Sequence, residues 1–197
     1  MGLQLAGLGS MTRDGRASII LIGPMAAGKS WLGRGLAQSH GYAFVDSDEY
    51  IVAHHGEIAQ IFVDHGEAHF RDLEASSIEE ILREDLGERS VVSLGGGAPM
   101  SERVRRLLQG HTVVFVRVDA DTVRPRIMRD ASRPMLQPDP MRRWQEIFDE
   151  RVGTYEELAD IVVDASGPRD VPELVEEIHH AVQDKKHQAE SESHEVG

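Results

Sequence analysis

Gly23-Pro24-Met25-Ala26-Ala27-Gly28-Lys29-Ser30 is a glycine-containing turn between an apolar run at residues 17–22 and a helix-forming segment at residues 31–40. A turn of this kind between a buried strand and a helix is typical of loops that bind nucleoside triphosphates. Its backbone N–H groups surround phosphate oxygens, and the following helix adds the positive end of its dipole. The stretch therefore predicts a phosphate-binding loop, with an ordinary glycine turn as the alternative.

Two side chains at the end of this loop have chemistry suited to a metal-bound triphosphate. Lys29 would reach the β- and γ-phosphates, and the hydroxyl of Ser30 would bind Mg²⁺, a hard cation that takes oxygen ligands. Together with backbone contacts, the predicted nucleotide-binding positions in the loop are Gly23, Ala26, Ala27, Gly28, Lys29 and Ser30.

The composition limits the classes of protein that fit. A chain of 197 residues suits one domain with a substantial core. The formal net charge of −13 argues against nucleic acid as a partner. The absence of cysteine excludes disulfides and fits a cytoplasmic protein. No apolar run approaches the ~18 residues of a membrane span, so we expect no membrane partner.

Short apolar runs alternate with segments of helical periodicity, which favours an α/β fold with a central parallel sheet of about five strands flanked by helices. The expected strands are residues 17–22, 42–45, 91–94, 112–118 and 160–163. We expect a single domain at residues 16–183, with a helical substrate cap at about 48–83 and a lid loop at about 129–140. Residues 1–15 and the acidic stretch 184–197 are expected to be loose tails.

Asp46 and Asp48 follow the second expected strand directly, so both should lie at the edge of the sheet that carries the phosphate loop. In a kinase, one carboxylate would support Mg²⁺ and the other would accept a hydrogen bond from the hydroxyl to be phosphorylated. The alternative is that Asp46 or Ser47 simply caps the helix that begins near Asp48.

Taken in order, six motifs of this chain resemble those of the shikimate kinases, over about residues 17–165. They are residues 23–30, Phe44-Val45-Asp46-Ser47-Asp48, residues 66–74 (GEAHFRDLE), Gly95-Gly96-Gly97, residues 133–136 (RPML), and Arg151 with Tyr155. The resemblance implies an ATP-dependent kinase that phosphorylates the 3-hydroxyl of shikimate to 3-phosphoshikimate, and a monomer. The alternatives are a kinase of gluconate or of a related polyol acid, and a non-catalytic nucleotide-binding module.

The resemblance also implies roles for individual residues. Arg71 and Arg151 would hold the carboxylate of shikimate, because guanidinium forks suit that anion. Glu74 would orient Arg71, Asp48 would position the acceptor hydroxyl, and Asp46 would join the magnesium shell. Without the family context, Arg71 would instead form a helix-surface ion pair with Glu67 or Glu74.

Further implied contacts come from a glycine run and from arginines near the lid. Gly95, Gly96 and Gly97 would let the substrate approach the backbone closely. Arg133 would close over the phosphates as a catalytic lid residue. Arg129 would contact the adenine, with Arg126 as its competitor.

Three departures from the family pattern stand out. Ala26 replaces a usual glycine, which costs on the order of 1 kcal/mol if the position needs a positive φ. Trp31 replaces a small hydroxylated residue and is also a candidate nucleotide-binding position. It would pack beneath the nucleotide or against the sheet, of which we favour the core position. The segment 56–62 is one residue shorter than its family counterpart, which bears on the identity of the acceptor.

Overall fold

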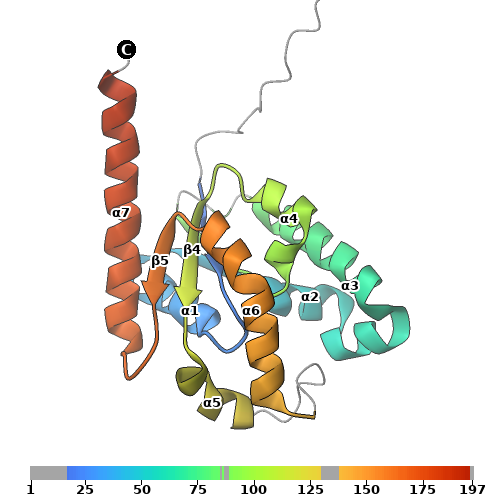
Figure 1. The fold of residues 1–197 in the computed structure, drawn as a ribbon. Helices are drawn as coiled ribbons and strands as arrows, with labels where there is room; N and C mark the ends of the chain where they lie inside the picture. The colour runs from blue at the N-terminus through green and yellow to red at the C-terminus, as the bar shows by residue number, and fades with distance from the viewer. Residues whose placement is uncertain (1–16, 85, 87–88, 130–137, 196–197) are drawn as a thin grey trace, which may run out of the picture.

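The computed structural model describes residues 17–84, 86, 89–129 and 138–195 and shows one parallel sheet covered by helices (Figure 1). The strand order is β2-β3-β1-β4-β5, and every neighbouring pair is parallel. The strands are β1 (Ile19–Ile22), β2 (Ala43–Asp46), β3 (Ser90–Ser93), β4 (Thr112–Arg117) and β5 (Ile161–Asp164). The predicted fold class is confirmed, and each observed strand overlaps an expected one.

Helices cover both faces of the sheet, as a parallel sheet requires. They are α1 (Lys29–His40), α2 (Ser47–His55), α3 (Ile58–Arg83), α4 (Glu102–Leu107), α5 (Ala120–Arg129), α6 (Pro140–Leu158) and α7 (Val171–Glu195), with a short 3₁₀ turn at Ala98–Met100. Helices α1 and α7 pack together, and α3 packs on α2 and α4.

Strand β1 lies at the centre of the core because all four of its side chains are buried. Ile19 and Leu21 pack on the side of α1 and α7, whereas Ile20 and Ile22 pack on the opposite side with α3 and α4. A strand buried on both faces reads as a continuous apolar run, which is why residues 17–22 predict it. The phosphate loop begins directly at its carboxyl end.

The expected cap has a small apolar cluster of its own, in which Ile51 of α2 contacts Ile61 and Phe70 of α3. Helix α3 changes direction at Gly66, whose φ is 82° and ψ is 173°. Further along α3, Ile78 and Ile81 pack with the sheet residues instead. The first half of α3 is therefore the part that stands beside the sheet.

Residues 184–195 are helical, so the expectation of a loose tail beginning at residue 184 is wrong for them. Buried Val182 anchors α7 just before this segment, and Lys185 forms an ion pair with Asp160 at 2.9 Å. Glutamate, lysine, glutamine and alanine, all good helix formers, then continue the helix. The expected tail at residues 1–15, the lid residues 130–137 and residues 196–197 lie outside the described part of the chain.

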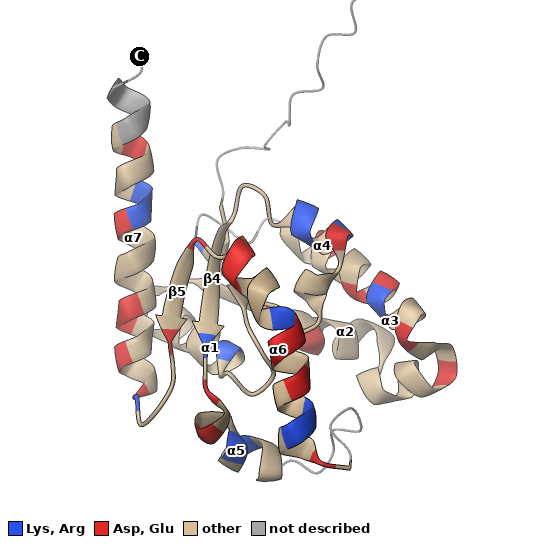
Figure 2. Cartoon of the chain, in the orientation of Figure 1, with Lys and Arg blue, Asp and Glu red and all other residues tan. Residues whose placement is uncertain are grey.

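Charges of both signs are interspersed along α3, α4 and α6 and along the described part of α7 (Figure 2). The net charge of −13 is therefore spread over several elements of the surface. Among the described residues, no helix is both long and apolar enough to cross a bilayer.

Candidate active site

The phosphate loop has a strained backbone that brings it close to the sheet. Gly23 has a φ of 141°, and a Cβ built there would lie 2.6 Å from the carbonyl oxygen of Val116, so no side chain fits without movement. Ala26 has a φ of 64° and is the non-glycine residue with positive φ in the described chain. The condition under which alanine costs energy at this position is therefore met.

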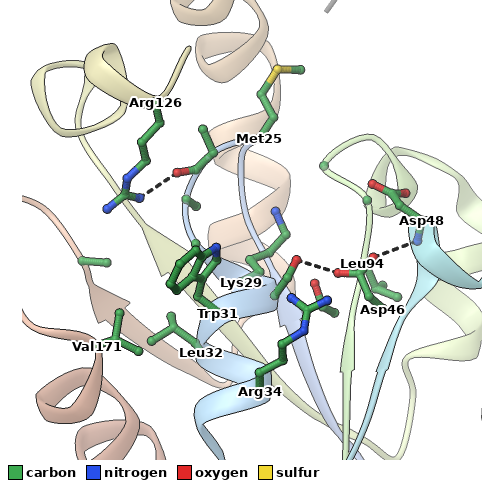
Figure 3. Close-up of a pocket in the computed structure, with 18 of the residues that line it drawn as sticks. Met25, Lys29, Trp31, Leu32, Arg34, Asp46, Asp48, Leu94, Arg126 and Val171 are labelled. Carbon is green, nitrogen blue, oxygen red and sulfur yellow. Dashed lines mark hydrogen bonds between the residues drawn. The ribbon is translucent and has the colours of Figure 1, made fainter. Parts of the chain in front are cut away.

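Lys29 lies at the start of α1, is 8% exposed, and extends back over the loop. Its Nζ donates to the carbonyl oxygens of Gly23 and Pro24, each at 2.9 Å. Gly28, with a φ of 95°, precedes the helix in the N-cap position. The first turn of α1 and the ammonium group therefore face the same hollow (Figure 3), which is the arrangement that binds polyphosphate.

Two residues outside the loop hold its next two carbonyl groups. The indole Nε1 of buried Trp144 donates to Met25 O at 3.1 Å, and Arg126 donates to Ala26 O at 2.8 Å. Arg126 also lines the cavity around the loop, whereas Arg129, the residue we expected there, is exposed and is not part of that lining in the described structure. Of these two arginines, Arg126 is therefore the one that lies at the phosphate loop.

A cavity of about 790 Å³ surrounds the loop and continues to the carboxyl ends of β2 and β3. It is large enough for a nucleotide and a small second substrate. Its lining comprises residues 25–32, Arg34, Asp46, Asp48, Glu49, residues 93–96, Arg126, Ala165, Arg169, Val171 and Leu174.

Asp46 serves both as a helix cap and as a partner of the loop. Its Oδ1 accepts from the backbone N–H groups of Asp48 at 3.0 Å and Glu49 at 3.3 Å, which caps α2. Its Oδ2 accepts from the hydroxyl of Ser30 at 2.6 Å. Cap and site are thus compatible, and the two facing oxygen atoms form a donor set that fits Mg²⁺ with water and phosphate as further ligands.

Asp48 lies on the first turn of α2 and reaches the glycine run after β3. A Cβ built on Gly95 would lie 2.8 Å from Asp48 Oδ1 and 2.8 Å from Glu74 Oε1. The backbone N–H of Gly95 donates to Ser47 Oγ at 3.0 Å, which fixes this backbone against α2. The carboxylate of Asp48 therefore lies beside the backbone of Gly95, in the lining of the cavity.

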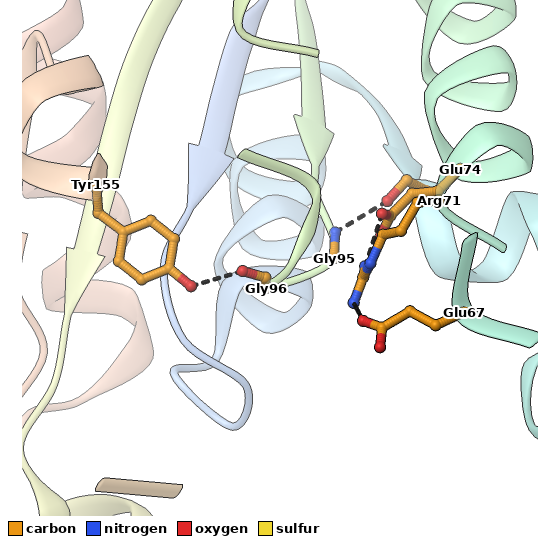
Figure 4. A network of polar contacts seen from close by, with 7 residues as sticks. Glu67, Arg71, Glu74, Gly95, Gly96 and Tyr155 are labelled. Atoms are coloured by element: carbon orange, nitrogen blue, oxygen red, sulfur yellow. Dashed lines mark hydrogen bonds and ion pairs between the residues drawn. The ribbon is translucent and has the colours of Figure 1, made fainter. Parts of the chain in front are cut away.

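Arg71 forms ion pairs with both of the glutamates that we considered as its helix-surface partners (Figure 4). Its Nη1 lies 2.8 Å from Glu74 Oε2, and its Nη2 lies 3.3 Å from Glu67 Oε1. It is nevertheless only 24% exposed, and a Cβ built on Gly97 would lie 2.5 Å from its Nη1. The guanidinium is thus held by Glu74 directly against the glycine run. A surface ion pair alone would not require that position.

Arg151, on α6, approaches the same place from the other side. It lies one helical turn before Tyr155 on α6, and the hydroxyl of Tyr155 donates to Gly96 O at 2.6 Å. Burial raises the pKa of Tyr155, and Arg151 and Arg71 oppose that shift. The Tyr155 hydroxyl thus contacts the glycine run, and Arg151 lies near enough to Tyr155 to influence its titration. Arg71 and Arg151 lie beside the cavity but outside its lining.

Glu74 is buried among these side chains and is 2% exposed. Burial raises its pKa, Asp48 adds to the shift, and Arg71 and Arg151 oppose it. All four charged side chains therefore interact within one small region. Glu74 forms the ion pair with Arg71 that an orienting role needs, and the role itself stays a prediction.

Trp31 does not pack in the core as we favoured, because its side chain is 72% exposed and lines the cavity. Helix α1 buries Leu32, Gly33 and Leu36, and Trp31 is turned away from that face by its position next to Leu32. Arg133, the expected lid residue, lies outside the described residues.

Comparison with known proteins identifies the family. The family model of shikimate kinase matches residues 25–183. The chain belongs to the shikimate kinase family. It is 41% identical to the shikimate kinase of Streptomyces coelicolor over 150 residues, which are 76% of this chain and 86% of that protein. The one from Streptomyces avermitilis is 40% identical over 160 residues, with 80% and 92% covered.

Solved structures of the family agree with the fold. The shikimate kinase of Acinetobacter baumannii in complex with shikimate superposes with a TM-score of 0.80 at 30% identity and covers 87% of this chain and 95% of that one. A gluconokinase from Sinorhizobium meliloti has a TM-score of 0.59 at 20% identity, with 90% and 97% covered, and shares the fold alone. The family and fold predicted from the motifs are confirmed.

Sequence reasoning missed two contacts of this site. Tyr155 entered only as part of a motif, although its spacing of four residues from Arg151 places both on one helix face. Trp144 carried no signal, because nothing in its local pattern shows that its indole meets the phosphate loop.

Proposed function

We propose that this protein transfers the γ-phosphoryl group of ATP to the 3-hydroxyl of shikimate, giving 3-phosphoshikimate and ADP. The observation that carries the proposal is the shared glycine run, Gly95–Gly97. Gly96 lies against the phosphate loop, with a built Cβ 3.3 Å from Met25 N, and Gly97 lies against Arg71. In this proposal, a polyphosphate site at the loop and a cationic pocket for an organic acid at Arg71 would therefore adjoin.

In this proposal the loop and Lys29 hold the triphosphate, with Lys29 exchanging its carbonyl partners for phosphate oxygens. Ser30 and Asp46 would hold Mg²⁺, and the bound ion would neutralise charge on the β- and γ-phosphates. Phosphoryl transfer has a loose transition state, so alignment and charge neutralisation dominate catalysis.

On the acceptor side, Arg71 and Arg151 would bind the carboxylate of shikimate, and Asp48 would accept a hydrogen bond from the reacting hydroxyl. Asp48 orients the hydroxyl first and receives its proton as the new P–O bond forms. Arg133 would contribute charge from the lid. Glu74 touches no substrate in this scheme and acts by holding Arg71.

An ADP-release assay with shikimate, quinate and gluconate as separate acceptors tests the proposal. We expect turnover with shikimate and its loss in Lys29→Ala, which removes the cation from the transferred phosphate. Turnover on gluconate with none on shikimate would overturn the choice of acceptor. ADP binding without turnover on any of the three would favour the non-catalytic alternative.

A further inference from the structure

Trp31 is a large aromatic side chain that the proposed phosphoryl transfer does not use. The chain has two tryptophans, of which Trp144 is 1% exposed and hydrogen-bonded, whereas Trp31 is 72% exposed. Tryptophan has the largest aromatic side chain, and exposed apolar surface in a pocket marks ligand contact.

The cavity has two ends, and Trp31 lies at the end away from the acceptor residues. The phosphate loop occupies the middle, and Asp48, Gly95 and Gly96 form one end. Arg126 and Val171 lie on the side opposite Asp48 (Figure 3), and Ala165 and Leu174 also line the cavity. In Figure 3, Trp31 lies between Arg126 and Val171. If the γ-phosphate faces Asp48, the nucleoside must leave the loop toward Trp31.

The chemistry of this second end suits a flat heteroaromatic group. An indole face, aliphatic side chains and a guanidinium plane can all pack on a nucleobase. Base–aromatic stacking strengthens binding by about 5- to 150-fold per base, and it does so for any base because it uses the ring face.

We propose that Trp31 binds the adenosine part of the nucleotide by packing its indole against it. This inference rests on the proposed function for the presence of a nucleotide, and it adds an affinity determinant that this chain has in place of a small hydroxylated residue.

Calorimetric titration with ADP and with pyrophosphate, both in the presence of Mg²⁺, tests the inference. In Trp31→Thr we expect ADP affinity to fall about tenfold while pyrophosphate affinity stays within twofold of the parent. Trp31→Phe should keep most of the ADP affinity, because it retains a ring face. Val162→Thr, an isosteric change of a 45% exposed residue outside the cavity lining, is the matched control and should change neither affinity.

The outcomes separate the two proposals. Equal ADP affinity in parent and Trp31→Thr would overturn the role of Trp31 and leave the proposed function intact. Equal weakening of ADP and pyrophosphate would overturn it too, because Trp31 would then act through the phosphate loop. A parent that binds neither ligand would refute the proposed function and this inference together.

Discussion

Replacing Arg71 by lysine separates the geometry of the guanidinium from its charge. Arg71 uses Nη1 for Glu74 at 2.8 Å and Nη2 for Glu67 at 3.3 Å, beside Gly97. A planar fork can keep the Glu74 contact while it offers further N–H donors to a substrate carboxylate. A lysine ammonium at this site would be held by buried Glu74 and would lose that second set of donors.

The loss should amount to about one hydrogen bond to a charged group, which contributes about 1.5–3 kcal/mol. We therefore expect the KM for shikimate to rise about 10- to 150-fold. The KM for ATP should change less than about twofold, because the arginine lies outside the nucleotide part of the cavity. Since the ammonium still neutralises Glu74, the thermal midpoint should move by less than about 4 °C.

Steady-state kinetics with each substrate varied in turn measure both constants. Arg83→Lys is the matched control, because Arg83 pairs with Glu79 four residues away on the same helix and is 64% exposed. It should leave both constants unchanged. An unchanged KM for shikimate in Arg71→Lys, or an equal rise of both KM values, would refute the assignment of Arg71 to the acid.

Three further changes probe the loop, the buried carboxylate and the tyrosine. Ala26→Gly removes a left-handed alanine that costs about 1–2 kcal/mol, but the glycine adds about 0.5–1 kcal/mol of chain entropy to the unfolded state. Scanning fluorimetry should therefore show a midpoint up to about 6 °C higher, and a lower midpoint would contradict the strain argument. Glu74→Gln tests the raised pKa of Glu74: the folded state binds that proton more tightly, so the parent loses stability as pH rises through the raised pKa. The stability of the variant relative to the parent should therefore increase from pH 4 to pH 8 in thermal scans, and a decrease would show that the shift has the opposite sign. Tyr155→Phe leaves the Gly96 carbonyl without its donor at a cost of about 1–3 kcal/mol, so the midpoint should fall by about 2–12 °C and kcat/KM for shikimate should fall with it; an unchanged kcat/KM would limit Tyr155 to a structural role.

The elements that position the site were predictable because their signals are local. Strand β1 is apolar on both faces, and the glycine turn with Lys29 and Ser30 follows it directly. Asp46 could be placed at the same sheet edge because parallel strands end together. Its two roles could not be separated from the sequence, since one carboxylate oxygen caps α2 and the other faces Ser30.

Other features depend on what lies opposite a residue, which no local pattern contains. Arg126 and Arg129 are three positions apart on α5, about 60° apart around the helix, so the choice between them depends on how the helix is tilted over the loop. The exposure of Trp31, by contrast, could be predicted locally. Leu32 and Leu36 lie four residues apart on the buried face of α1, so Trp31 points away from that face. That signal was present in the sequence and was outweighed by the general tendency of tryptophan to be buried.

The glycine run shows why the family motifs work together and not as separate sites. A Cβ built on Gly95 would meet Asp48 and Glu74, whereas one on Gly97 would meet Arg71. Gly96 faces the phosphate loop instead, and its carbonyl accepts from Tyr155. Each of these three adjacent glycines thus lies close to a different part of the structure, where a side chain would collide. Because one short backbone segment spaces the phosphate loop from Arg71, a shift of either one would change the distance between the two proposed substrate sites. Transfer of a phosphoryl group requires that distance to be fixed before the reaction begins.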